Sequence, residues 1–346
     1  MASLLFCSVL GLAEVKPNFE LVRDLHKVST KPGMVVSGDY LFIADMNEDY
    51  SYSVFVYDKT SLRLIHESRL NHSITGLYAY GNGVVALGRQ SSPHWSSHLT
   101  TVTSQNGRFS KSHRLLSDEI IAESAVADGA KLYLNEKGSR AIFSLANSRS
   151  YLRKMNHEFL GPANDMRIEN NTLYVVELRG LFQYGDEALA AVDLKTGEKR
   201  FIADGTKFMG LHQVEIIGDT LYGVELAVDR VVAIDLAKDA VIGRITLPQG
   251  AYGIGRYGQC AAVVSGEAKI LSFIRAHESG IKEIHSVDLA HAGDKLKQPR
   301  SLGFDMDSHR VFVRSNYPCG GCTVTQSSVV AFDLSEIAAL EGCFQN

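Results

Sequence analysis

Seven copies of one short pattern constrain the fold of this chain more than any other feature of its sequence. Successive copies start 40 to 50 residues apart, which is the period expected of one blade of a β-propeller. A fixed period argues against a β-sandwich, and the lack of helical periodicity outside residues 334–340 excludes a helical solenoid. In each copy a turn residue precedes a β-rich run, and these turn residues are Gly38, Gly81, Gly129, Asn170, Gly218, Gly258 and Ser308.

The repeat predicts an all-β, seven-bladed β-propeller with four-stranded blades. A short strand precedes each turn, a third strand ends in an acidic turn, as in residues 189–193, and a fourth strand follows most copies, as in residues 198–202. The second strands are predicted at residues 41–45, 84–88, 132–136, 173–177, 221–225, 261–265 and 311–315.

The seventh copy lacks an outer strand. Its third strand, at residues 328–333, is followed by residues 335–342, which read as a short helix. An open edge strand would invite aggregation, so the ring has to be closed. Residues 19–28 have the right length and β character, and we predict that this N-terminal strand pairs with residues 328–333. Residues 14–346 would then form a single domain.

Two runs in the middle of the chain resemble the repeats of YVTN-type seven-bladed propellers. They are Leu173-Tyr-Val-Val-Glu and Leu221-Tyr-Gly-Val-Glu, followed by Val192-Asp-Leu-Lys-Thr-Gly and Ala233-Ile-Asp-Leu. The resemblance covers nearly the whole chain and implies the fold, although Val-Glu replaces the Thr-Asn of the family's name. That family spans periplasmic binding proteins and surface proteins, so the resemblance implies no single chemistry.

The first thirteen residues predict a signal peptide and therefore a secreted or periplasmic protein. They are almost wholly apolar and end in Gly11-Leu12-Ala13, with small residues at −3 and −1 of a cleavage site. The run is short and no Lys or Arg precedes it, so an ordinary strand is the alternative. No stretch reaches the about 20 apolar residues of a transmembrane segment. The net charge of −4 and the lack of a long basic run argue against nucleic acid as a partner.

Five cysteines give an ambiguous pattern. Cys7 belongs to the predicted signal peptide, and Cys260 falls inside an apolar strand, where it reads as a small buried hydrophobic residue. Cys319 and Cys322 form one C-x-x-C with no second pair to complete a zinc site. A local disulfide is preferred for these two, with a metal or redox role or free thiols as alternatives.

Alignment of the repeats on their turns predicts a pocket at the mouth of the axial channel. The residue five positions before each turn is small in five copies, as expected where seven inner strands crowd round an axis. The two exceptions, Asp165 and Gln213, are polar, and polar residues also cluster just before them. The predicted ligand-binding pocket consists of Glu123, Asn164, Asp165, His212, Gln213 and Tyr252.

Carboxylates end four of the second strands. Like charges around one rim would raise one another's pKa unless a cation neutralises them, so a cationic ligand or a divalent cation is one interpretation. The other is that these acids cap backbone N–H groups or pair with Arg89, Arg179 or Arg300. The four rim acids are Asp45, Glu136, Glu177 and Glu225, and the last three are expected to ring the pocket.

Long loops are expected on the same face, where recognition usually resides on a rigid scaffold. They span residues 46–53, 89–98, 178–188 and 316–327. The second of these carries the only tryptophan, Trp95, which we expect to contact ligand. His94 and His98 could ligate a metal, but four residues apart on a Ser-rich loop they are more commonly solvated.

The sequence is compatible with two candidate functions. The first is a secreted or periplasmic propeller that binds a small ligand or a protein through the long-loop face and the channel mouth. The alternative is a lyase- or hydrolase-type enzyme that uses Glu123, Asp165 and His212 as acid and base, with or without a divalent metal. Binding is favoured because no nucleophile elbow, H-E-x-x-H, phosphate-binding loop or dinucleotide fingerprint occurs.

Overall fold

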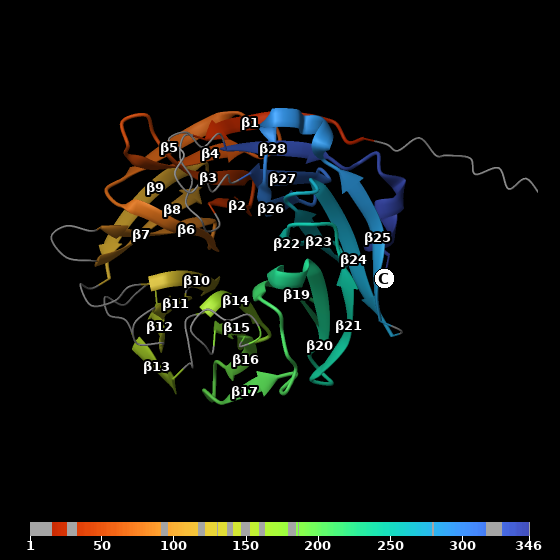
Figure 1. Cartoon of the computed structure of the whole chain (residues 1–346). Coiled ribbons are helices and arrows are strands. Elements are labelled where there is room, and N and C mark those ends of the chain that lie inside the picture. Colours follow the sequence, from red (N-terminus) through yellow and green to blue (C-terminus); the bar gives the residue numbers. More distant parts are fainter. Residues whose placement is uncertain are drawn as a thin grey trace, which may run out of the picture.

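In the described part of the chain, twenty-eight strands form seven four-stranded antiparallel sheets, which surround a central axis as the blades of a propeller (Figure 1). This confirms the predicted fold and blade number. Blades 1 to 6 consist of β2–β5, β6–β9, β10–β13, β14–β17, β18–β21 and β22–β25, and blade 7 consists of β26–β28 with β1. The computed structural model describes residues 16–25, 33–90, 96–116, 122–129, 131–136, 141–146, 153–158, 163–178, 185, 187–278, 280–315 and 327–345.

The innermost strands are β2 (Met34–Ser37), β6 (Ser73–Tyr80), β10 (Ala122–Asp128), β14 (Ala163–Glu169), β18 (Leu211–Ile217), β22 (Ala251–Tyr257) and β26 (Pro299–Asp305). The second strands, all within two residues of their predicted bounds, are β3 (Tyr40–Met46), β7 (Gly83–Gln90), β11 (Lys131–Glu136), β15 (Thr172–Leu178), β19 (Thr220–Glu225), β23 (Cys260–Ser265) and β27 (Arg310–Ser315).

The third strands are β4 (Tyr52–Asp58), β8 (Ser96–Gln105), β12 (Ala141–Ala146), β16 (Glu187–Asp193), β20 (Arg230–Asp235), β24 (Ile270–His277) and β28 (Ser327–Asp333). The outer strands are β5 (Leu64–Leu70), β9 (Arg108–Leu115), β13 (Arg153–Glu158), β17 (Lys199–Ile202), β21 (Ala240–Thr246), β25 (Gly280–Asp288) and β1 (Phe19–Leu25).

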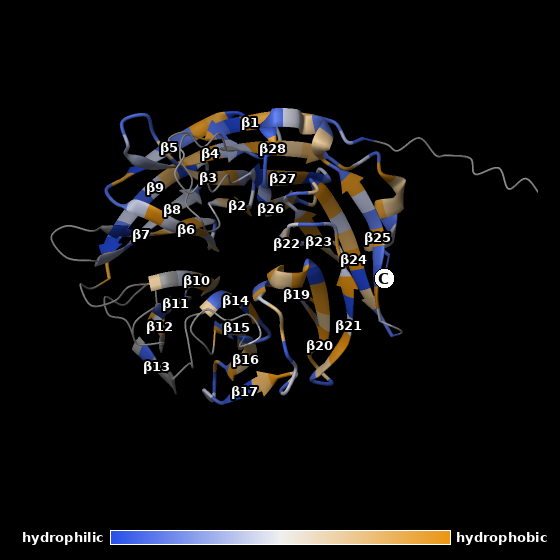
Figure 2. Ribbon diagram, in the orientation of Figure 1, coloured by the Kyte–Doolittle hydropathy of each residue, from blue (hydrophilic) through white to orange (hydrophobic). Residues whose placement is uncertain are grey.

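Local sequence explains how the first two strands of a blade are joined. The turn residues Gly38, Gly81, Gly218 and Gly258 have φ between 53° and 60°, a left-handed conformation that glycine adopts without strain. The second strands that follow are buried on both faces, because each sheet is packed between two neighbours. Some outer strands carry more polar residues than the second strands, as β9 and β25 do (Figure 2).

The N-terminal strand closes the ring as predicted. β1 pairs antiparallel with β28, with Phe19 opposite Phe332 and Asp24 opposite Ser328. Leu25 at its end is buried in the cluster between blades 7 and 1. The ring is therefore held by strand pairing between the two ends of the domain.

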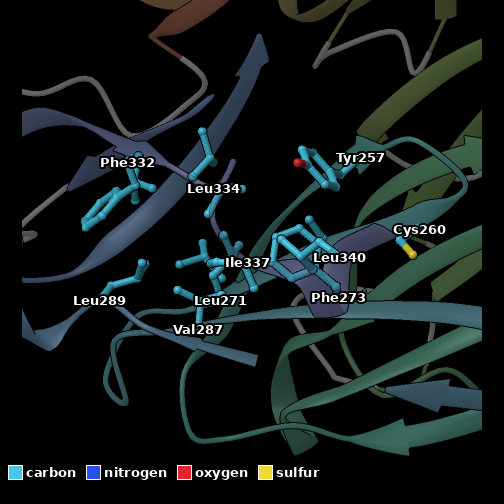
Figure 3. Close-up of a cluster of buried hydrophobic side chains, with 14 of the residues drawn as sticks. Tyr257, Cys260, Leu271, Phe273, Val287, Leu289, Phe332, Leu334, Ile337 and Leu340 are labelled. Atoms are coloured by element: carbon cyan, nitrogen blue, oxygen red, sulfur yellow. The ribbon is translucent and has the colours of Figure 1, made fainter. Parts of the chain in front are cut away.

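A hydrophobic cluster between blades 6 and 7 is covered by two short 3-10 helices, η2 (Ala290–Lys295) and η3 (Ala338–Cys343) (Figure 3). A third 3-10 helix, η1 (Leu226–Val228), follows β19. The helical segment expected after the last third strand is thus present as η3. None of the helices in the described ranges is long and apolar enough to cross a membrane.

Cys260 is not simply a buried hydrophobic residue, and here the sequence-based prediction was wrong. It forms a disulfide with Cys343 of η3, with the two Cα atoms 5.2 Å apart. The partners are separated by 83 residues in the chain, so no local pattern could reveal the pair. Both residues are fully buried, and the bond ties the C-terminal segment to blade 6.

Candidate functional site

A channel of about 860 Å³ follows the propeller axis and is lined by residues of all seven innermost strands. Asn164, Asp165, His212, Gln213 and Tyr252 all line it. The structure therefore brings together five of the six residues predicted for the channel pocket. Their role in ligand binding stays a prediction.

Four of the other predicted site residues have side chains that the structure does not describe. Glu123 belongs to β10, but its side chain is not described. Trp95, Cys319, Cys322 and residues 1–13 fall outside the described residues altogether. Their predicted roles in recognition, disulfide formation and targeting are therefore not tested.

Asp165 joins two neighbouring blades. The register of β14 against β15 shifts between Ala163 and Met166, which places Asp165 in an irregular segment at the mouth. Its Oδ1 accepts hydrogen bonds from the Met166 amide (2.9 Å) and from Arg167 Nη1 (2.8 Å). Its Oδ2 accepts one from the Val214 amide of blade 5 (3.0 Å). Both oxygens are therefore committed to contacts within the protein.

Gln213 and Asn164 make the same kind of link. Gln213 Oε1 accepts a hydrogen bond from the Ile254 amide of blade 6 (3.3 Å), and Asn164 Nδ2 donates one to the Leu211 carbonyl of blade 5 (3.0 Å). The free edge of an innermost strand has no further strand to satisfy its backbone groups. The polar side chains of Asn164, Asp165 and Gln213 satisfy some of these backbone groups. These three residues therefore have a structural role besides any role in binding.

A second polar layer lies two residues further along the innermost strands, at Arg167 and Glu215. Arg167 Nε is 3.7 Å from Glu215 Oε2, and the two side chains are 31% and 22% exposed. Burial disfavours the charge on Arg167, but Asp165 and Glu215 outweigh it and raise the pKa of the guanidinium. Burial also raises the pKa of Glu215, although Arg167 opposes the rise.

Sequence reasoning missed this layer although the signal was present. Alternate residues of a strand face the same side, so the positions two after Asp165 and Gln213 had to line the channel as well. Those positions are Arg167 and Glu215.

An aromatic platform forms the mouth of the channel. The rings of His212 and Tyr252 meet edge to face with their centroids 5.0 Å apart. The guanidinium carbon of Arg300 lies 4.6 Å from the centroid of the Tyr252 ring, a distance typical of a cation–π contact. The platform presents an aromatic face and a positive charge at the entrance.

The two sides of the channel differ in polarity. Blades 4 to 6 contribute the charged and amide side chains described above, together with Arg256. The other side is lined mainly by apolar residues of blades 7, 1, 2 and 3, among them Val35, Leu77, Val126 and Phe304. The channel can therefore offer hydrogen bonds on one side and apolar contact on the other.

The rim acids do not belong to the lining of this channel, and their expected part in ligand binding stays a prediction. Glu225 is fully buried within blade 5, where Oε2 accepts hydrogen bonds from Arg230 Nε (2.8 Å) and Arg244 Nε (3.2 Å). Its Oε1 accepts one from the Met209 amide (2.9 Å). Two arginines of the protein neutralise this carboxylate, and a backbone amide donates a further hydrogen bond to it.

The other rim acids are also buried. Glu177 forms an ion pair with Lys199, and Asp45 forms one with Arg23 at 3.1 Å. Glu136 is 4% exposed. Among the described residues, the cations paired with Glu177, Asp45 and Glu225 come from outer or third strands. Arg179, one of the three arginines suggested by the sequence, lies outside the described residues. Within the described ranges, no group of three or more His, Cys, Asp and Glu side chains is placed to hold a metal ion.

His98 is not a solvated loop residue, because β8 begins at Ser96. It is 7% exposed, and its Nδ1 is 3.0 Å from Nε2 of His113. Its ring stacks on that of His72 with 5.3 Å between centroids. The cluster of His72, His98 and His113 lies in blade 2 and was not predicted.

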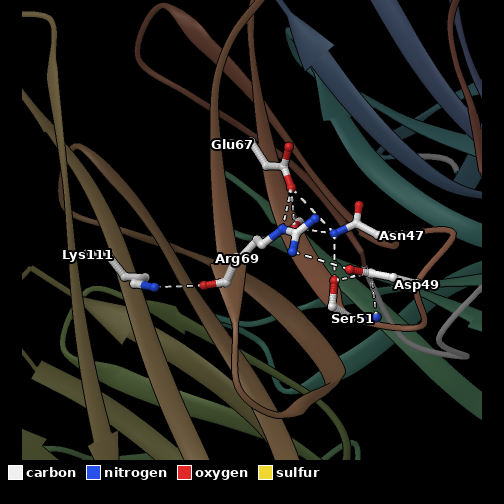
Figure 4. A network of polar contacts seen from close by, with 7 residues as sticks. Asn47, Asp49, Ser51, Glu67, Arg69 and Lys111 are labelled. Atoms are coloured by element: carbon white, nitrogen blue, oxygen red, sulfur yellow. Dashed lines mark hydrogen bonds and ion pairs between the residues drawn. The ribbon is translucent and has the colours of Figure 1, made fainter.

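The loop after β3, in contrast, is on the surface and is held by a dense polar network (Figure 4). Asn47 Nδ2 donates hydrogen bonds to Ser51 Oγ (2.9 Å) and Ser53 Oγ (2.8 Å), and Arg69 pairs with Asp49 at 3.2 Å. Tyr50 at the tip is 71% exposed. The long-loop face therefore presents a rigidly supported aromatic residue.

Comparison with known proteins identifies the fold. No protein-family model matches the chain, and no curated protein matches its sequence. BamB from Moraxella catarrhalis aligns at TM-score 0.51 with 13% identity, over 88% of this chain and 86% of that one. The RRP9 WD40 repeats align at TM-score 0.66 with 11% identity, over 92% and 99%. A chain of the mitotic checkpoint complex also aligns at TM-score 0.66, with 9% identity, over 92% and 94%. At these identities the likeness shows the fold alone, a seven-bladed β-propeller.

Proposed function

We propose that this chain is a secreted or periplasmic binding propeller that takes a small polar ligand at the mouth of its axial channel. The observation that carries the proposal is the concentration of hydrogen-bonding residues on one side of the channel, opposite an apolar side. Ligand pockets combine apolar walls with a few convergent polar groups in this way. The aromatic platform of His212 and Tyr252 would contact the ligand as it enters.

The disulfide supports the proposed secreted or periplasmic location. Bonds of this kind form and persist in oxidising environments and are rare in the cytosol. Peptide mapping of the protein isolated from its own cells, without reduction, is expected to find Cys260 linked to Cys343. Recovery of both cysteines as free thiols would contradict the secreted or periplasmic location.

Binding is favoured over catalysis because of how Asp165 is held. A general acid or base needs an oxygen that can exchange a proton with the substrate. Both Asp165 oxygens accept hydrogen bonds from backbone amides, and one of them also from Arg167. The acid/base pair suggested by the sequence would have to break these contacts in order to act.

A protein partner remains the second candidate, carried by the long-loop face. The exposed Tyr50 sits on a loop that its own hydrogen bonds hold in place, and rigid aromatic residues are frequent anchors in protein interfaces. The similarity to a component of the mitotic checkpoint complex agrees with such a use of the fold. The two candidates use different parts of the molecule and can be separated by mutation.

The test is a thermal-shift screen of sugars, amino acids, nucleosides and organic acids, followed by titration of any compound that raises the Tm. We expect His212→Ala and Tyr252→Ala to weaken binding at least about 10-fold, because the aromatic platform is lost. The matched control is His66→Ala, an outer-strand histidine that stacks on Phe109 with 4.9 Å between centroids. Equal effects of all three variants, or no shift with any compound, would contradict the channel proposal.

A further inference from the structure

Arg314 is a fully buried arginine at the contact between blades 7 and 1. It lies one residue before the end of β27, opposite Ser301 of β26 and Val329 of β28. Its side chain has no exposed surface. A Cβ atom added to Gly33, which immediately precedes β2, would lie 1.4 Å from Arg314 Nη1. Glycine at position 33 is therefore what allows the guanidinium to lie against blade 1.

The guanidinium has no hydrogen-bond acceptor among the described residues. Its Nε, Nη1 and Nη2 atoms are all buried and unpaired. The carboxylate that acts on it electrostatically is Asp45, but Oδ1 of Asp45 accepts from the Met46 amide (2.8 Å) and Oδ2 accepts from Arg23 Nε (3.1 Å). Arg314 therefore faces a carboxylate whose two oxygens already serve other donors.

The charge at this contact does not balance. Burial lowers the pKa of Arg314 to about 10, against the opposing effect of Asp45, so the group is still protonated at neutral pH. Two arginines, Arg23 and Arg314, thus share the single carboxylate of Asp45. The flanking segments 26–32 and 316–326 contain no Asp or Glu in their sequences. An unpaired buried charge is costly, and an anion is the simplest compensation.

The position of Arg314 relates it to the channel. Its strand partner Ser301 lines the channel, and so does Met34, the residue that follows Gly33. The guanidinium is therefore one residue layer behind the channel wall, on the side away from the polar residues of blades 4 to 6. An anionic group that passed between these two lining residues would meet its five N–H donors.

We propose that Arg314 binds an oxyanion, either a carboxylate or a phosphate group, at the contact between blades 7 and 1. The planar guanidinium matches both groups through paired N–H···O hydrogen bonds, and such charge-assisted bonds are about twice as strong as neutral ones. The bound oxyanion supplies the counter-charge that Asp45 cannot provide to two arginines. This site is separate from the proposed channel site and stands without it.

The first experiment measures the Tm of the full chain in sodium phosphate, sodium sulfate and sodium acetate against sodium chloride at constant ionic strength. A saturable rise of about 2 °C is expected at a concentration ten times Kd, for a chain of this length. A response to acetate alone identifies a carboxylate ligand, and a response to phosphate or sulfate identifies a tetrahedral oxyanion. No response to any of the three overturns the proposal.

The second experiment repeats the titration with Arg314→Met and Arg314→Gln, which remove the charge but keep most of the volume. Both variants are expected to lose the anion response and to keep the wild-type Tm in chloride. Arg244→Met is the matched control, because Arg244 also lies beside a buried carboxylate but is paired with it, in blade 5. It should retain the anion response. A response that persists in both Arg314 variants overturns the assignment.

Discussion

In blade 5 the seventh residue after the turn is Glu225, whereas the same place in the repeat of blade 2 is Gly88. Glu225 is surrounded by two arginines and a backbone amide. In blade 2 the space is taken by His72, since a Cβ on Gly88 would lie 2.0 Å from His72 Nδ1. The repeat thus determines where a buried polar site lies, and the neighbouring strands determine whether a carboxylate or an imidazole fills it.

The two sites hold their polar groups in different charge states. The Ser73 carbonyl can only accept, so His72 Nδ1 donates to it (2.8 Å), and Nε2 is left to accept from Thr100 Oγ1 (2.8 Å). His98 and His113 stack beside this ring, at 5.3 and 5.7 Å. Blade 5 contains a buried ion network, and blade 2 contains the neutral imidazole of His72. The two sites should therefore respond differently to mutation and to pH.

The largest effect is expected from Glu225→Ala. The change leaves Arg230, Arg244 and the Met209 amide without their shared acceptor, and we expect a loss of about 3 kcal/mol in the free energy of unfolding. Urea denaturation at pH 7 measures it. Arg230→Met is the control and should cost less, because Glu225 keeps its other two donors. A loss under about 1 kcal/mol for Glu225→Ala would show that the network contributes little.

Acid should destabilise blade 2 through His72. Burial lowers the pKa of His72 from 6.5 to about 4, with His98 and His113 adding to the effect. As the pH falls, the unfolded chain therefore binds a proton at a higher pH than the folded chain does. The stability contributed by neutral His72 is fully present above pH 6.5 and is lost as the pH falls toward 4. The loss attributable to His72 is about 3 kcal/mol.

Unfolding free energies of the wild type and of His72→Gln, measured from pH 7 to pH 4, check this contribution. Glutamine does not titrate, so the variant should show a flatter dependence on pH over this range. Parallel curves for the two proteins would mean that His72 does not titrate as proposed and that other groups carry the acid sensitivity.

Gly88→Ala is expected to cost about 2 kcal/mol, because the added methyl group overpacks a full site. Besides His72, the Cβ would meet the Ser73 carbonyl oxygen at 1.7 Å, and backbone cannot move aside cheaply. Gly342→Ala is the control, since its Cβ would find its nearest neighbour, Ile284 Cγ2, at 3.7 Å. Equal stabilities of the two variants, measured in urea, would contradict the tight packing of His72.

The smallest effect is expected from Arg314→Met in an anion-free chloride buffer. Removal of a buried charge that lacks its own partner should change the free energy of unfolding by less than about 1 kcal/mol, in contrast to Glu225→Ala. Asp45 keeps Arg23, so no new unpaired group is created. A loss of about 3 kcal/mol in the free energy of unfolding would mean that Arg314 has a stabilising partner, as the arginines of blade 5 do.

The sequence predicted what depends on local periodicity. Alternation of side chains along a strand, turn residues and repeat spacing act within a few residues, so the blade number and the second strands were confirmed. The closing strand β1 followed from the missing outer strand of blade 7. Five residues of the channel pocket were predicted from their position before the turn. Arg167 and Glu215 could have been predicted in the same way, because they lie two residues further along the same strands and face the same side.

Only the tertiary structure decided which distant groups meet. The pairing of Cys260 with Cys343, the cations that neutralise Glu225 and Asp45, and the position of Arg314 against Gly33 all depend on how blades and outer strands are packed together. Long side chains reach several ångströms across these contacts, and the sequence spacing of such partners follows no period. The local pattern therefore determines where a polar group lies in a blade, and the packing of neighbouring strands and blades determines its partner.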